Sequence, residues 1–146
     1  MGLFDAFRTE MAPAFNLQQA LMTIIVAAVK ADGIVQREEV LRIQSICALS
    51  PIFARNSSEE DLTVIRFADN ITSQLGDKAV LEAAQALSPE LRETAFAFAT
   101  DMIAADGIVG ADEEAFLTSL MHKLELPEDR GRWIVWVTMV RNRAAT

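Results

Sequence analysis

Apolar residues recur at spacings of three and four along most of the chain, which is the pattern of amphipathic helices. The longest apolar run extends from Ala20 to Val29 and is interrupted only by Thr23, so it predicts a central helix buried on all sides. No segment alternates as a strand would. We therefore predict an all-α fold, a single-domain helical bundle of about seven helices, over residues 16–31, 36–49, 57–75, 77–87, 88–105, 111–124 and from 127 onward.

Residues typical of helix ends support these boundaries. Ser57 and Glu60 have the spacing of a capping box, in which each side chain bonds the backbone N–H of the other residue. Gly76 is placed to end that helix. Ser88 followed by Pro89 is a strong helix-start signal, because serine caps well and proline suits the first helical position.

The chain has 146 residues, of which 51% are hydrophobic and 23% charged. This length and composition predict one globular domain over residues 1–146, with an N-terminal arm over residues 1–15 before the first long helix. The apolar run from Ala20 to Val29 would rise only about 15 Å as a helix, half of a bilayer core. Asp5 and Glu10 interrupt the apolar start of the chain, which argues against a secretory signal. We expect a cytoplasmic protein that does not insert directly into membranes.

The formal net charge is -8, from 13 basic and 21 acidic residues. Such a surface repels phosphate backbones, which argues against nucleic acid as a partner and favours cations or basic protein surfaces. His122 is the only histidine and Cys47 the only cysteine. We expect His122 at the surface or its boundary and Cys47 as a small buried hydrophobe. No nucleophile–base pair is visible, so we expect no enzyme, no catalytic residue and no organic cofactor.

A five-residue sequence, ADGIV, occurs twice, at residues 31–35 and 105–109. Each copy follows one apolar helix and precedes the next, and 74 positions separate Asp32 from Asp106. We predict two pseudo-repeated helix–DGIV–helix hairpins whose corners meet or face similar surroundings. The glycines of the two copies, Gly33 and Gly107, can end a helix with positive φ, and one apolar side chain of each copy can turn into the core.

One interpretation of the acidic residues after each corner is structural. If Gln36 and Gly110 are N-caps, Glu39 and Glu113 fall three positions into their helices. There a carboxylate can accept a hydrogen bond from the N–H of the capping residue. The acidic residue before each of them would oppose the positive end of the helix dipole.

The other interpretation is a cation site. Aspartate, glycine, valine and glutamate of each copy fit positions 5, 6, 8 and 12 of an EF-hand calcium loop. Positions 1 and 3 would be Ala28 and Lys30 in the first copy and Met102 and Ala104 in the second, which cannot bind calcium. Each corner is thus half a site, and two together could share calcium or magnesium. The candidate metal ligands are Asp32, Glu38, Glu39, Asp106, Asp112 and Glu113.

A pair of such acidic corners on an all-helical chain of this length resembles the TerB family of tellurite-resistance proteins. The resemblance is carried by residues 31–39 and 105–113. It implies a compact cytoplasmic stress-response module that works through protein partners, including a membrane-associated complex. It also implies that the acidic corner residues are metal ligands. Arg37 departs from the family pattern, because its positive charge could neutralise part of a first-corner site.

Electrostatics limits how such a module could act. Tellurite is an anion, and a chain with a net charge of -8 would not bind it strongly. We therefore expect a non-catalytic sensing module with a divalent cation at its corners, or alternatively a protein-binding scaffold in which the corners only cap helices. A homodimer is a further candidate assembly. We expect Trp133 and Trp136, three apart on the last helix, to pack in the core or in an interface, whereas an exposed pair would mark a partner site.

Overall fold

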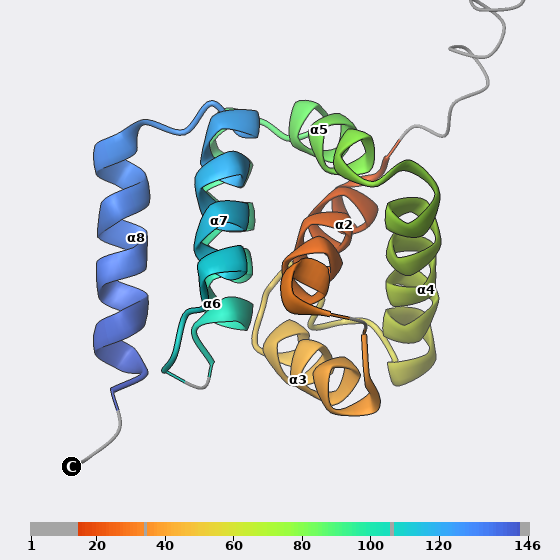
Figure 1. Cartoon of the computed structure of the whole chain (residues 1–146). Helices are drawn as coiled ribbons and strands as arrows, with labels where there is room; N and C mark the ends of the chain where they lie inside the picture. The colour runs from red at the N-terminus through yellow and green to blue at the C-terminus, as the bar shows by residue number, and fades with distance from the viewer. Residues whose placement is uncertain (1–14, 34, 106, 144–146) are drawn as a thin grey trace, which may run out of the picture.

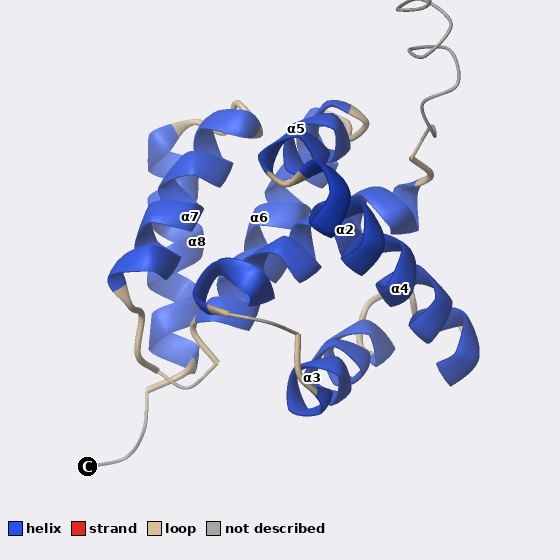
Figure 2. Ribbon diagram, turned by 45° about the vertical axis from the view of Figure 1, so that its right-hand side comes forward, coloured by secondary structure: helices blue, strands red, loops and turns tan. Residues whose placement is uncertain are grey.

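The computed structural model describes residues 15–33, 35–105 and 107–143, without the side chain of Asp32. In these residues the chain forms seven α-helices, one single-turn 3-10 helix and no strand, which confirms the predicted all-α fold (Figures 1 and 2). None of the described helices is both long enough and apolar enough to cross a membrane. The elements are α2 (Leu17–Val29), η1 (Lys30–Asp32), α3 (Arg37–Ala48), α4 (Ser58–Leu75), α5 (Asp77–Gln85), α6 (Pro89–Ile103), α7 (Ala111–Lys123) and α8 (Glu128–Arg141).

Helix α2 lies at the centre of the molecule and packs against α4, α5 and α6. Every residue from Ala20 to Val29 is buried, as the apolar run predicts, and only the first turn reaches solvent. Thr23 is tolerated in this core because its hydroxyl donates to the Gln19 carbonyl at 2.7 Å. The helix is therefore stabilised by burial around its whole circumference rather than along one stripe.

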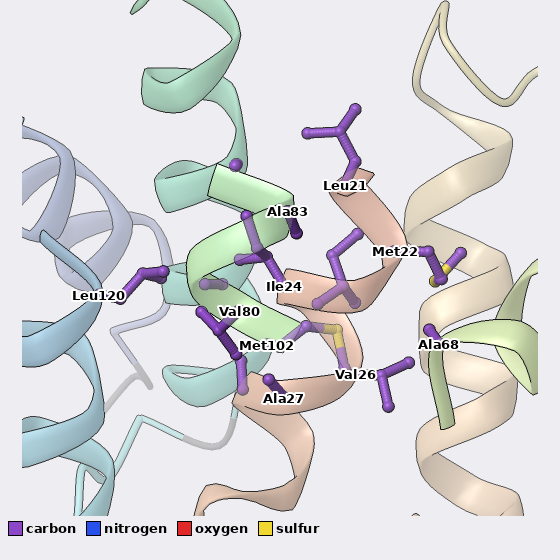
Figure 3. Close-up of a cluster of buried hydrophobic side chains, with 14 of the residues drawn as sticks. Leu21, Met22, Ile24, Val26, Ala27, Ala68, Val80, Ala83, Met102 and Leu120 are labelled. Atoms are coloured by element: carbon purple, nitrogen blue, oxygen red, sulfur yellow. The ribbon is translucent and has the colours of Figure 1, made fainter. Parts of the chain in front are cut away.

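Small side chains let the neighbouring helices approach α2 closely. Ala68 of α4 and Ala83 of α5 are fully buried. Figure 3 shows them around the larger side chains of α2, together with Met102 of α6 and Leu120 of α7. One hydrophobic core thus extends through most of the described elements.

The predicted helix starts are present. At α4, the Ser57 hydroxyl accepts from the Glu60 N–H at 3.1 Å, and the Glu60 carboxylate accepts from the Ser57 N–H at 3.0 Å. At α6, the Ser88 hydroxyl accepts from the Leu91 N–H at 3.4 Å and Pro89 occupies the first helical position. These local bonds fix the boundaries that the sequence indicates.

The helices that follow the two corners have different neighbours. Helix α7 packs back against α6, whereas α3 packs against α4. Helix α8 lies at the edge of the molecule and packs against α6 (Figure 1). Two ion pairs hold it there: Arg130 binds Glu93 through two contacts of 2.6 and 2.9 Å, and Arg141 binds Asp101 at 2.8 Å.

Candidate functional site

The two corners share a local layout but differ in backbone geometry. Gly107 has a φ of 78°, in the left-handed region that favours glycine, as predicted. The matching prediction for Gly33 is wrong, because its φ of 163° is extended backbone that any residue adopts. In each corner the valine, Val35 or Val109, is half-buried against the core, whereas Ile108 is exposed.

The glutamate of each corner acts as a helix cap. The Glu39 carboxylate accepts a hydrogen bond from the Gln36 N–H at 3.1 Å, and the Glu113 carboxylate accepts one from the Gly110 N–H at 3.0 Å. Both bonds are the ones that the structural interpretation predicts. One oxygen of each carboxylate is thereby committed to its own backbone.

The cation hypothesis depends on residues that the structure describes only in part. Asp106 and the side chain of Asp32 lie outside the described residues. Glu38 and Asp112 are exposed in the first turns of α3 and α7. Among the described side chains, no group of three or more His, Cys, Asp or Glu residues could hold a metal ion. The first corner lies against the helix that follows the second corner, since η1 packs against α7.

Lys30, whose side chain cannot bind calcium, anchors the first corner. The Lys30 ammonium lies 2.6 Å from the Asp69 carboxylate and donates to the hydroxyls of Thr72 and Ser73, both at 2.9 Å. These partners lie on α4, so Lys30 connects the end of α2 to that helix. The corresponding position in the second corner is Ala104, which is buried. The first corner thus carries a fixed positive charge that the second does not.

A groove of about 760 Å³ lies between α6, α7 and α8 and is largely apolar. Within the groove, α8 comes close to the Met121 side chain at Gly131: a Cβ at Gly131 would lie 2.5 Å from the Met121 sulfur. Charged residues of α7 and α8 also line it: Glu114, Glu128 and Arg132. The apolar lining is formed by Phe96, Ile103, Ala104, Val109, Leu117, Met121, Val135, Trp136 and Met139.

The outer face of α8 carries large apolar side chains that no described element covers. Trp133 is 72% exposed and Trp136 66% exposed, and Val137 and Val140 continue the same face. Their spacing of three and four residues places these four side chains on one stripe of the helix, and this stripe faces solvent. Gly131 and Thr138, both small, are buried toward the core instead. Neither tryptophan packs in the core, and the condition stated for a partner site, an exposed tryptophan pair, is met.

The remaining chemistry-bearing side chains are inert or ordinary. Cys47 is fully buried, and burial, with a smaller contribution from the Asp61 carboxylate, raises the pKa of its thiol to about 12. Its thiol is thus held in the unreactive, protonated form at neutral pH. His122 is exposed on α7, as expected.

Comparisons of the chain with family models, with curated proteins and with solved structures find no match. The resemblance to TerB proteins therefore depends on the two corner motifs and the all-helical layout alone.

Proposed function

We propose that this chain is a non-catalytic, TerB-like protein-binding module whose binding site is the groove between α6, α7 and α8. The observation that carries the proposal is the apolar groove itself. Its volume of about 760 Å³ is within the range of binding clefts, and its lining is largely apolar with a few charged groups. The capping bonds of Glu39 and Glu113 favour the same conclusion, because they give the acidic corners a structural task.

The chemistry of the groove indicates the kind of partner. Its apolar lining suits the apolar face of an amphipathic helix, with anchors at spacings of three, four and seven residues. Glu114 and Glu128 lie in the groove, and Arg132 is bound to Glu128 at 2.6 Å. Together with the net charge of -8, this favours a partner segment with basic residues beside its apolar anchors.

The test uses two matched threonines. Thr118 lines the groove on α7, and Thr63 lies on α4; both are exposed, and each donates its hydroxyl to the carbonyl four residues earlier at 3.0 Å. Helical peptides that bind the wild-type protein are selected from a library, and their affinities are measured by fluorescence anisotropy. We expect Thr118→Trp to fill the groove and weaken binding by about tenfold or more, and Thr63→Trp to leave it unchanged.

Backbone amide chemical shifts provide the second measurement. On peptide binding, the largest changes are expected for residues of α6, α7 and α8 that line the groove. If the selected peptides bind Thr118→Trp as tightly as wild type, or shift residues of α3 and α4 instead, the groove is not the binding site and the proposal is wrong.

A cation at the corners is the second candidate function, and one observation favours it. Because η1 packs against α7, the first corner lies against the helix that begins after the second corner, and a shared site would require the two corners themselves to be close. The test is calorimetric titration with calcium and then magnesium, comparing wild type with the Asp32→Asn, Asp106→Asn double variant. Asp77→Asn with Asp129→Asn is the matched control, since both are exposed aspartates in first turns of helices. Saturable heats that only the corner variant loses would support the site; equal heats in all three proteins would refute it.

The link to chemical stress comes from the TerB resemblance. It predicts that cells lacking this protein are more sensitive to tellurite and that the Thr118→Trp variant fails to restore resistance.

A further inference from the structure

We infer that the outer face of α8 is a self-association surface, on which a second copy of this chain packs antiparallel across a two-fold axis. The surface is the stripe of Trp133, Trp136, Val137 and Val140, which no described element covers. It goes beyond the groove proposed above, because it takes a different partner and because Trp136 alone of the four residues lines the groove.

The order of the four residues makes the stripe self-complementary. In an antiparallel pair of identical helices, each contact between residues i and j occurs twice. If the two-fold axis passes midway between Trp136 and Val137, then Trp136 packs against the partner's Val137. Trp133 then packs against the partner's Val140. Each large ring thereby meets a small branched side chain, as knobs meet holes in a helix pair. A parallel pair would instead stack tryptophan on tryptophan and leave the valines loosely packed.

The charges at the ends of the stripe fit the same register. Asp129 precedes the stripe and Arg143 follows it, and both are exposed. Neither makes an ion pair with another described residue, and the Arg143 guanidinium lies 5.9 Å from the centre of the Trp136 ring. The antiparallel arrangement places Asp129 close to the partner's Arg143, and the two-fold axis repeats the pair. Opposite charges thus meet at both ends of the interface.

The other charges of α8 do not oppose this approach. Three arginines flank the stripe, and each is bound to an acidic residue of its own chain: Arg130 to Glu93, Arg132 to Glu128 and Arg141 to Asp101. The flanks are therefore locally neutral, although the whole chain carries a net charge of -8.

The exposed area sets the expected affinity. Two tryptophans and two valines exposed to this degree offer on the order of 500 Å² per chain. A dimer would bury about 1,000 Å² in total, at the lower end for specific interfaces. We therefore expect a reversible dimer with a dissociation constant in the micromolar range.

The experiment is sedimentation equilibrium of the full chain from about 1 µM to about 1 mM, a range that spans the expected dissociation constant. Fluorescence provides a parallel readout, because Trp133 and Trp136 are the only tryptophans and both lie on the stripe. We expect wild type to dimerise with rising concentration and its tryptophan emission to shift to the blue as it does.

Charge reversal tests the register. Asp129→Arg and Arg143→Asp should each weaken dimerisation by about tenfold, because each creates two like-charge contacts. The double variant should recover to near the wild-type dissociation constant. Both sites are exposed, so the variants should keep the fold, which circular dichroism checks.

Three outcomes would overturn the inference. A wild-type chain that stays monomeric to about 1 mM has no such interface. A dimer that is insensitive to both single reversals, or that the double reversal does not restore, uses another surface or register. A chain that stays monomeric but shifts its emission when vesicles of phosphatidylcholine and phosphatidylglycerol are added uses the stripe for a membrane surface instead. The Thr118→Trp variant should dimerise like wild type, so failure of the groove proposal and failure of this one are distinguishable.

Discussion

Replacement of Lys30 by methionine tests whether the first corner is anchored to α4. Methionine keeps most of the aliphatic stem and removes only the ammonium group. Lys30 is the C-cap residue of α2, and its ammonium group contacts the Asp69 carboxylate at 2.6 Å and the hydroxyls of Thr72 and Ser73 at 2.9 Å. The substitution therefore separates the polar contacts from packing.

The magnitude follows from what each partner loses. Hydrogen bonds from a charged group contribute about 1.5–3 kcal/mol, and a positive charge at a helix C-terminus adds about 0.3–1 kcal/mol. The loss is limited because no donor is left unpaired: the Thr72 hydroxyl still donates to the Ala68 carbonyl at 2.7 Å. Asp69 is 48% exposed and regains water. We expect Lys30→Met to lower the free energy of unfolding by about 2 kcal/mol.

Urea denaturation followed by circular dichroism measures this loss, with an unchanged m-value as the sign that only stability has changed. Lys78→Met is the matched control. Lys78 is 69% exposed and approaches Glu82 only to 4.0 Å, so its removal should change the free energy by less than about 0.5 kcal/mol. If the two variants lose the same stability to within about 0.5 kcal/mol, the Lys30 contacts do not anchor the corner and the reasoning is wrong.

Three further predictions follow from the described contacts. The bidentate bond from Arg130 lowers the pKa of the Glu93 carboxyl below its ordinary 4.5. The stability that this ion pair contributes above pH 4.5 should therefore be lost as the pH falls through the lowered pKa. On acidification, the urea midpoint of Glu93→Gln should fall less than that of the wild type. Glu113→Ala should lower the free energy of unfolding by about 0.5–1 kcal/mol, and most of this loss should remain in high salt. The smaller loss caused by Asp112→Ala should vanish in high salt, because salt screens the interaction of its charge with the helix dipole. If both losses respond equally to salt, the result contradicts the capping bond of Glu113. The buried Cys47 thiol, with its pKa raised to about 12, should react with iodoacetamide at pH 8 only after the protein is unfolded, and rapid labelling of native protein would disprove its burial.

Local signals in the sequence were sufficient for the helices and their ends. The bonds between Ser57 and Glu60, and those that Glu39 and Glu113 make to their helix starts, span only three residues. Such bonds depend on residue type and spacing alone. The burial of α2 was equally predictable, because an apolar run without a polar side has no face to turn toward water.

The exposed tryptophan pair could be foreseen only as an alternative to packing in the core or an interface, and the groove was not predicted. Helix α8 has apolar residues around much of its circumference, so periodicity does not select the face that packs. In the structure Gly131 and Thr138 are the buried residues of α8, and their small side chains suit its packing against α6. The larger Trp133 and Trp136 are left exposed, and Trp136 also lines the groove.

The sequence by itself determined the all-α class, the helix boundaries and caps, the central position of α2 and the two acidic corners. Each of these depends on interactions within a few residues or on the apolar content of one segment. Only the tertiary structure decided that Lys30 binds α4, that α3 and α7 take different neighbours, and that α8 exposes its tryptophans. Those outcomes depend on which side chains of distant segments fit together, because close packing is a property of pairs of surfaces and not of one helix.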